Sequence, residues 1–497
     1  MNGARRPCQT VGVNHELVDR LAADLRAADF TVDALTALWG EDAAAALHRG
    51  DRVPALRALS GSALSTLARA FVLGVPCERP DLAAALPALG LGGAVELGLV
   101  MADGAPRLDL RPYSFVDGRG IVNWWIASDL GELALGHAIP EDHVLGVGGA
   151  SMTLSGLMIS APVGVVLDLG TGCGIQAMHA SRHAERVVAT DISKRALDLA
   201  AFNCALNGIG NVEFRLGSLF EPVAGERFGQ VVSNPPFVIT PRVAGVPAYE
   251  YRDGGMVGDG IVATVVRDVE SALEPGGIAQ LLGNWEYPGG LERVESWVSE
   301  TSLDAWVVER ERQDVARYAE TWIRDGGTRP GPEFDRLVGV WLDDFAARGV
   351  TEVGFGYVTL RKPLTEPTLR RFERLDGATG GSLSEHLRTC LDIHDRLLGT
   401  DLFATRFTVA PDVTEERHYW PGAEHPTVIR LQQGTGFART VPVGTALAAV
   451  VGACDGELSL GAICDAVADL LGTAPQALRD ELVSHVRELA FTGMLLP

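Results

Sequence analysis

The chain has 497 residues, of which 47% are hydrophobic and 21% charged, so length and composition predict a folded globular protein of several domains. Its formal net charge is −22, and no basic stripe at the scale of the chain suits the phosphate contacts of a nucleic-acid binder. The seven cysteines form no CxxC pair and the eleven histidines show no HExxH spacing, which argues against metal sites and a disulfide framework. No apolar run reaches the roughly 18 residues of a membrane span, which argues against a membrane-spanning segment.

The first part of the chain, residues 1–110, is predicted to be a helical, winged-helix-like domain. Its first ten residues, MNGARRPCQT, lack the apolar region that follows in a signal peptide, and with the odd number of cysteines this predicts a cytoplasmic location. Apolar residues then recur at helical spacing, as at Leu17, Leu21 and Leu25. Two short strands are expected at residues 98–100 and 107–110, and helices followed by a hairpin indicate the winged-helix-like fold.

The central part, residues 111–365, is predicted to be an α/β domain. Apolar strands alternate with glycine-rich turns and helices from residue 163 onward, with strands expected at 165–169, 187–191, 212–216, 229–233 and 277–282. This alternation predicts a doubly wound, Rossmann-like sheet whose site lies at the carboxyl ends of its strands. A glycine-rich stretch at 147–151 is a candidate for closing that site. An insertion with helices near 315–323 and 334–345 is a candidate for the substrate wall.

The last part of the chain divides into two predicted regions. Residues 366–440 carry mixed helix and strand signals and are interpreted as a connecting α/β region. Residues 441–497 contain two amphipathic helices, followed by Gly493 and an apolar end, which indicates a winged-helix-like domain. This domain has seven acidic side chains against Arg479 and Arg487, so a protein-facing or structural role is favoured over DNA binding.

The first motif with a chemical meaning runs from Asp168 to Gly174 and reads DLGTGCG. A strand, a glycine loop and a helix in sequence bring a backbone turn close to a ligand, since a side chain there would collide with it. Asp191 ends the next strand, where a carboxylate can accept hydrogen bonds from both hydroxyls of a ribose. NAD sites favour GxGxxG, whereas the GxGxG spacing here, two residues after Asp168, is similar to the S-adenosylmethionine (SAM) motif. Taken alone, the loop also fits a different nucleotide or an ordinary turn.

The second motif, Asn234-Pro235-Pro236-Phe237, directly follows the fourth strand of the sheet. Two successive prolines impose a rigid extended path at the place where an acceptor should meet the cofactor. An amide or arylamine nitrogen is a poor nucleophile because its lone pair is conjugated. The Asn234 side-chain oxygen and the Pro235 carbonyl can accept hydrogen bonds from the two N–H groups of this nitrogen and stabilise the positive charge that develops on it. Phe237 can stack on the planar group that carries the nitrogen.

Together the two motifs resemble the NPPY/NPPF branch of class I methyltransferases, over about residues 144–285. That branch includes HemK-type glutamine methyltransferases and enzymes that methylate bases of ribosomal and transfer RNA. The resemblance implies SAM as cofactor, no metal, and a nitrogen clamp at Asn234, Pro235, Pro236 and Phe237. It implies SAM contacts at Asp168, Gly170, Thr171, Gly172, Gly174, Asp191, Ile192, Ser218, Leu219 and Asn234. The chain departs from the branch at Ser218, where an acidic residue often contacts the adenine amine; Ser218 offers a weaker bond, and the Leu219 backbone a further contact.

The sequence leaves several functions open. The first is N-methylation of a protein or peptide, of the glutamine type, which the acidic charge favours. The second is methylation of an exocyclic amine of adenine or guanine in RNA, which the charge disfavours; small-molecule methylation and a non-catalytic SAM-binding module are further alternatives. The segment after the second motif, residues 249–260, is interpreted either as a substrate-covering loop or as a plain loop before a helix. The oligomeric state is left open.

Overall fold

The computed structural model describes residues 12–135, 137 and 139–497, so Cys8 and the MNGARRPCQT segment lie outside the described residues. The chain packs as two compact units. One contains the chain up to Ser155 and Ala161–Arg374, and the other contains Gly156–Ser160 and Leu375–Pro497. The division predicted from the sequence has four parts; here the first two share one unit, and most of the last two share the other.

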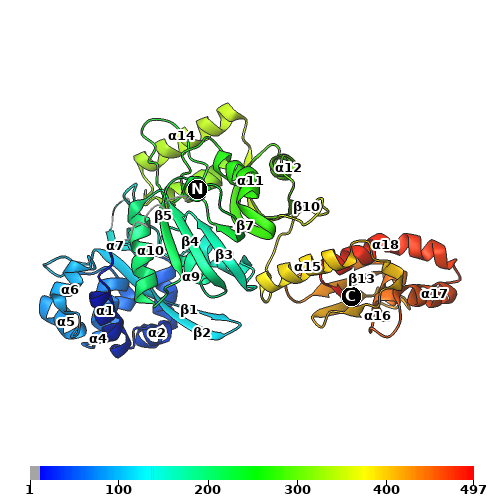
Figure 1. Cartoon of the computed structure of the whole chain (residues 1–497), viewed down its shortest axis with the longest axis horizontal. Coiled ribbons are helices and arrows are strands. Elements are labelled where there is room, and N and C mark those ends of the chain that lie inside the picture. The colour runs from blue at the N-terminus through cyan, green and yellow to red at the C-terminus, as the bar shows by residue number, and fades with distance from the viewer. Residues whose placement is uncertain (1–11, 136, 138) are drawn as a thin grey trace, which may run out of the picture. The chain divides into compact units, whose positions relative to one another are not determined.

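The N-terminal part is helical and ends in a hairpin (Figure 1). The hairpin strands are β1 (Leu108–Asp117) and β2 (Gly120–Asp129), which pair antiparallel along their whole length. The hairpin therefore begins at the predicted second strand and extends well past residue 110, while Val100 forms only a single bridge to Pro106. The winged-helix assignment stays a prediction. The helices are α1 (His15–Ala27), α2 (Val32–His48), α3 (Val53–Ala58), α4 (Ala63–Leu67), the π-helical turn Ala68–Val72, α5 (Arg79–Ala85) and α6 (Gly90–Glu96).

Within the described residues the central sheet has eight strands in the order β10-β8-β9-β7-β6-β3-β4-β5. Strands β3 to β7 are parallel, and β9 lies antiparallel between β7 and β8. This topology confirms the predicted Rossmann-like α/β sheet. β10 pairs with β8, so the sheet continues past the predicted boundary at residue 365. The strands are β3 (Val163–Leu169), β4 (Ala184–Asp191), β5 (Val212–Leu216), β6 (Phe228–Ser233), β7 (Leu273–Tyr287), β8 (Asp304–Asp314), β9 (Glu352–Arg361) and β10 (Arg370–Arg374).

The helices that accompany this sheet begin where the sequence offers a cap. Ser193 caps α10, and Asp314 caps α13 by accepting hydrogen bonds from two backbone N–H groups. Pro332 opens α14, and Gly349 ends it in a left-handed conformation. The two-helix insertion between β8 and β9 is thus present as predicted. These helices are α7 (Glu132–Leu135), α8 (Gly149–Leu157), α9 (Ile175–Ala180), α10 (Lys194–Leu206), the 3₁₀ turn Glu221–Val223, α11 (Gly260–Ala272), α12 (Leu291–Ser299), α13 (Val315–Asp325) and α14 (Pro332–Arg348).

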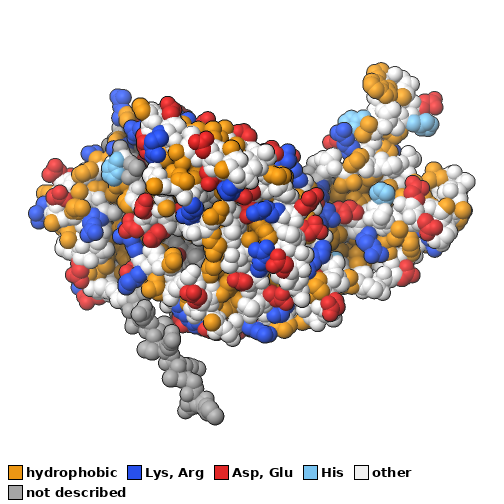
Figure 2. All heavy atoms as spheres, turned by 90° about the horizontal axis from the view of Figure 1, so that it is seen from above, with side chains coloured by type: hydrophobic (Ala, Val, Ile, Leu, Met, Phe, Trp, Pro, Cys, Tyr) orange, Lys and Arg blue, Asp and Glu red, His pale blue; other side chains and the backbone are white. Residues whose placement is uncertain are grey.

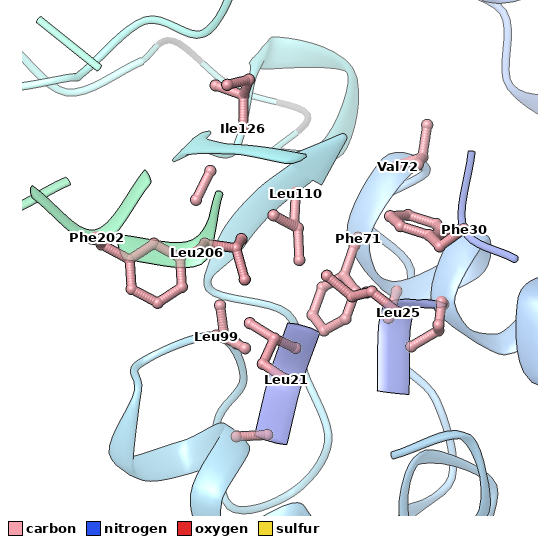
Figure 3. Packing of buried hydrophobic residues seen from close by; sticks show 14 of the residues in the cluster. Leu21, Leu25, Phe30, Phe71, Val72, Leu99, Leu110, Ile126, Phe202 and Leu206 are labelled. Atoms are coloured by element: carbon pink, nitrogen blue, oxygen red, sulfur yellow. The ribbon is translucent and has the colours of Figure 1, made fainter. Parts of the chain in front are cut away.

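The N-terminal helices and the sheet share one hydrophobic core through α10 (Figure 3). Phe202 and Leu206 of α10 pack in the same cluster as Leu21, Phe71 and Leu110. Figure 3 shows these side chains pointing toward one another from α1, the helical turn at 68–72, β1 and α10. This common core explains why residues 1–110 do not form a separate unit.

Polar contacts reinforce the same junction. Asn203, fully buried on α10, pairs with the backbone of Ala127 on β2: its amide donates to the Ala127 carbonyl at 2.9 Å, and its oxygen accepts from the Ala127 N–H at 2.7 Å. The same amide donates to the Cys173 carbonyl at 2.8 Å, in the glycine loop after β3. One turn later, Asn207 pairs with the backbone of Trp125 in the same way. The N-terminal part is thereby bonded directly to the loop of the predicted site.

The C-terminal unit contains a three-stranded antiparallel sheet, a helical core and a short strand pair, β11 with β15. The two helices predicted in residues 441–497 are present as α17 and α18, with Ile463 and Val486 buried between them and α16. The winged-helix assignment stays a prediction here too. The elements are α15 (Leu383–Leu397), the 3₁₀ turn Leu402–Ala404, β11 (Thr408–Val409), β12 (Val413–His418), β13 (Val428–Gln433), β14 (Thr440–Val443), α16 (Thr445–Gly452), α17 (Leu460–Leu471), α18 (Pro475–Phe491) and β15 (Leu495–Leu496).

Replacing Asn203 by Leu should destabilise the chain by roughly 2–4 kcal/mol, because three buried backbone groups lose their partners. The measurement is the midpoint of urea unfolding followed by circular dichroism. The matched control is Asp198→Ala on the same helix, which removes an exposed pair with Lys194 and should leave the midpoint unchanged. Equal midpoints for Asn203→Leu and the wild type would contradict the assigned role.

Candidate active site

The carboxyl ends of β3, β4 and β6 border a cavity of about 340 Å³. Most of the residues predicted from the two motifs line it, although they come from four separate loops. These lining residues are Gly170, Thr171, Gly172, Asp191, Ile192, Ser218, Leu219, Asn234, Pro235 and Pro236. Asp168, Gly174 and Phe237 do not line the cavity, and each lies behind its wall with a different set of contacts.

The glycine loop after β3 requires left-handed backbone at Gly170, Gly172 and Gly174, with φ of 77°, 55° and 89°. A Cβ added at Gly170 or Gly172 would meet no atom within 4 Å, because both positions face open space. A side chain there would enter the cavity. At Gly174 a Cβ would lie 2.8 Å from the Cβ of Ala200 on α10, so this glycine is needed for packing.

The buried Asp168 stabilises the glycine loop from behind the cavity wall. Its carboxylate, 1% exposed, accepts a hydrogen bond of 2.6 Å from the Thr171 hydroxyl and one of 2.9 Å from the Ala177 N–H. Burial raises the pKa of Asp168 to about 7, and the two hydrogen bonds oppose that rise. The residue therefore orders the loop and the start of α9.

Asp191 connects β4 to both neighbouring loops. Its carboxylate accepts hydrogen bonds from the N–H groups of Gly172 at 2.9 Å and Ser193 at 2.8 Å, and its backbone carbonyl accepts one from the Gly217 N–H at 3.0 Å. Burial raises the pKa of Asp191, while the hydrogen bonds to Ser193 and Gly172 lower it. Each oxygen keeps further accepting capacity, and the residue lines the cavity.

Asn234 presents an unsatisfied acceptor at the cavity. Its side-chain oxygen is buried and has no hydrogen-bond partner among the described residues, although the residue lines the cavity. Buried polar atoms without partners are rare in folded proteins and often mark a ligand. The preceding Ser233 donates from its hydroxyl to the Leu169 carbonyl at 2.8 Å, which fixes the end of β6 against the glycine loop.

Phe237 is turned away from the cavity. Its ring is 8% exposed and packs against Phe355 of β9 and Trp322 of α13, with ring centroids 5.5 and 6.3 Å away. This contact anchors the end of the motif to the insertion. The predicted stacking of Phe237 on a planar acceptor stays a prediction.

One wall of the cavity comes from the segment before β3. His143 and Gly146 line it, and Ser151 lies beside Gln176, whose amide donates to the Ser151 carbonyl at 2.7 Å. The Nδ1 atom of His143 is buried without a partner among the described residues. The glycine-rich stretch at 147–151 therefore adjoins the cavity, as expected. His143 and Gln176 were missed from the sequence because neither belongs to a motif or a periodic pattern.

Residues 249–255, called the roof segment below, also border the cavity. Their lining residues are Glu250, Tyr251, Asp253, Gly254 and Gly255. The roof segment has no regular structure of its own and is held from α13. The Tyr251 hydroxyl and the Arg252 guanidinium both donate to the same Asp325 oxygen at 2.7 Å, and Arg252 also donates to the Trp322 carbonyl at 2.6 Å. The insertion thus supports the wall from behind.

Helix α13 also fixes the chain just after the second motif. The buried Tyr318 hydroxyl accepts hydrogen bonds from the Ile239 N–H at 3.0 Å and from the Asn284 amide at 2.6 Å. The chain after the second motif and the roof segment, which are joined by the Val238 N–H to Arg252 carbonyl hydrogen bond of 2.9 Å, are therefore both bonded to one helix. No motif in the sequence points to these contacts, because they join residues 34 to 79 positions apart.

The described residues contain no group of three or more His, Cys, Asp or Glu side chains arranged to hold a metal ion. The described cysteines, at 77, 173, 204, 390, 454 and 464, are buried and form no disulfide bond. No helix in the described part of the chain has the length and apolar character needed to cross a membrane.

Three family models match separate parts of the chain. Residues 148–248 match the family described as "Methyltransferase small domain". Residues 27–111 and 393–497 match families described as domains of unknown function, DUF7059 and DUF7782. The first match contains the glycine loop, Asp191 and Asn234, and it confirms the predicted resemblance of the central part to class I methyltransferases.

Curated relatives match the same central part. "Ribosomal protein uL3 glutamine methyltransferase" of Bradyrhizobium diazoefficiens is 36% identical over 175 residues, which cover 33% of this chain and 50% of the relative. "Release factor glutamine methyltransferase" of Xylella fastidiosa is 47% identical over 75 residues, which cover 15% of this chain and 27% of the relative. The chain thus spans half the length of the first relative and about a quarter of the second.

Solved structures match more weakly. The YcgJ protein from Bacillus subtilis has a TM-score of 0.30 and 14% identity, over 43% of this chain and 97% of that chain. A 16S rRNA N2 G1207 methyltransferase from T. thermophilus, in complex with AdoMet and guanosine, has a TM-score of 0.28 and 20% identity, over 40% of this chain and 48% of that chain. TM-scores of this size are below the level at which a shared fold can be inferred, so the fold assignment rests on the strand order.

Replacing Tyr318 by Phe should lower the free energy of unfolding by about 1–3 kcal/mol, because the Ile239 N–H and the Asn284 amide lose their buried acceptor. The measurement is urea unfolding of the full chain. Tyr357→Phe is the matched control, since the Tyr357 hydroxyl has no hydrogen bond among the described residues, and it should leave stability unchanged. Identical unfolding curves for the two variants would show that α13 does not hold residue 239 as described.

Proposed function

We propose that the chain is a SAM-dependent N-methyltransferase that transfers a methyl group to a planar amide or amine nitrogen of a protein or peptide, of the glutamine type. One observation carries the proposal. A single cavity at the carboxyl ends of the strands joins the glycine loop, the Asp191 carboxylate and the unpartnered oxygen of Asn234. A nucleotide-binding loop and an acceptor for N–H groups in the same space match the two parts of such a reaction.

The lining residues fit SAM. Gly170 and Gly172 leave open space beside the backbone, and Asp191 keeps lone pairs for the hydroxyls of a ribose. Ile192, Ser218 and Leu219 line the cavity after β4 and β5, where the adenine side is proposed. Asp168, Thr171 and Gly174 set the shape of the glycine loop. When bound, SAM supplies an electrophilic methyl group on a sulfonium.

The residues of the second motif would activate the acceptor. The Asn234 oxygen and the Pro235 carbonyl accept the two hydrogens of the acceptor nitrogen, which aligns its lone pair with the methyl group. As positive charge develops on that nitrogen, these fixed dipoles stabilise it without reorganising. Pro236 keeps the path rigid, and Phe237 anchors the motif to Phe355 and Trp322.

Charge and relatives support a protein acceptor over RNA. The net charge is −22, and on the face drawn in Figure 2 acidic and basic side chains of the described residues are intermixed without a continuous basic area. The two curated relatives are named for a ribosomal protein and a release factor. We include in the proposal a cytoplasmic location and an acceptor selected by the segments at either end, residues 1–110 and 366–497.

Replacing Asn234 by Ala should lower methyl transfer on the order of 10²–10³-fold, because one preorganised polar group is lost, while SAM still binds. The measurement pairs transfer of tritiated methyl from SAM into a protein fraction with SAM affinity from calorimetry. Lys194→Ala, an exposed change on α10, is the control for both readouts. Undiminished transfer by Asn234→Ala would refute the nitrogen clamp, and a matching loss of SAM affinity would place Asn234 in cofactor binding only.

A further inference from the structure

The described residues that line the cavity carry more negative than positive charge. They include three carboxylates, of Asp191, Glu250 and Asp253, and no Lys or Arg. The histidine among them, His143, has its pKa lowered, mainly by burial, and is therefore neutral at pH 7. The unpartnered His143 Nδ1 and Asn234 oxygen mark the same space as a ligand site by a separate criterion.

The three carboxylates are not equivalent. Asp253 is buried and forms an ion pair with Arg242, and it also accepts a hydrogen bond from the Gly255 N–H at 3.1 Å. Asp191 accepts hydrogen bonds from the backbone at both of its oxygens. Glu250 is exposed, and its carboxylate has no ion pair or hydrogen bond among the described residues. Of the three carboxylates, it alone has neither a hydrogen-bond donor nor an ion-pair partner among the described residues.

The backbone of Glu250 is held in place. Its N–H donates to the Glu141 carbonyl at 2.8 Å, while the next residue, Tyr251, is bonded through its hydroxyl to Asp325 of α13. The preceding Tyr249 is buried and donates to the Gly326 carbonyl at 3.1 Å. Glu250 and Asp191 line the same cavity; burial raises the pKa of Asp191, and the Glu250 charge adds to that rise. A fixed backbone and an unpaired carboxylate make a directed negative field in the wall.

In the proposed reaction the cofactor loses its positive charge, so a negative charge in the cavity wall acts differently on the cofactor and on its product. SAM and its product, S-adenosylhomocysteine, share the adenine, the ribose and the amino-acid end. They differ by one methyl group and one positive charge, since the sulfonium becomes a neutral thioether. Contacts to the shared groups bind both molecules alike, whereas a fixed carboxylate distinguishes them.

We propose that Glu250 is a specificity-determining residue that favours the charged cofactor over its neutral product, so that SAM competes better than S-adenosylhomocysteine for the site. This inference rests on the proposed function. A single carboxylate in a partly exposed wall, screened by solvent and salt, corresponds to roughly a three- to tenfold difference in affinity for a unit positive charge.

The test is calorimetry of the full chain with SAM and with S-adenosylhomocysteine. Glu250→Gln keeps the size of the side chain and removes the charge. It should weaken SAM binding by about three- to tenfold and S-adenosylhomocysteine binding by less than about twofold. Asp191→Ala should weaken both ligands alike, because the ribose is common to them. Asp198→Asn, an exposed carboxylate on α10, is the control that should change neither.

Salt provides a second readout for the same proteins. Raising the ionic strength should reduce the wild-type preference for SAM and leave the preference of Glu250→Gln unchanged. If Glu250→Gln weakens both ligands equally or neither, while Asp191→Ala weakens both, the inference about Glu250 is wrong and the cofactor site stands. If neither ligand binds the wild type, or Asp191→Ala has no effect, the proposed function itself fails.

Discussion

The hydrogen bond from the Gly172 N–H to the Asp191 carboxylate is the constraint on which the site depends. It ties the loop after β3 to the end of β4, so two strands present their ends to one space. Asp168 supports the same loop from below, and Ser233 ties β6 to it. With these bonds in place, Asn234 and the glycine loop line one cavity, which is the arrangement that the proposed reaction requires.

Two elements outside the sheet hold this arrangement. On one side, Asn203 bonds the N-terminal hairpin to the glycine loop, so the first part of the chain is a structural support of the site. On the other side, α13 holds the roof segment through Asp325 and the chain after the second motif through Tyr318. The segments that flank the acceptor position are thus fixed by an insertion that the simple fold does not require.

The sequence predicted the sheet and most of the residues that line the cavity, because buried parallel strands are continuous apolar runs and because GxGxG and NPPF are local patterns. It did not predict what depends on distant pairing. β10 joins the sheet after residue 365, and the N-terminal helices merge into the core through Phe202 and Leu206. The orientation of Phe237 follows from Trp322, about 85 positions later, which no local pattern reveals.

The proposed reaction is the transfer of a methyl group from SAM to a glutamine-type nitrogen of a protein. The most direct measurement incubates the full chain with labelled SAM and a cell lysate, then treats the product separately with protease and nuclease and analyses the labelled residue. The proposed reaction should give label that is sensitive to protease, resistant to nuclease and recovered as N5-methylglutamine. Label that is sensitive to nuclease, or that is recovered in small molecules, would contradict it.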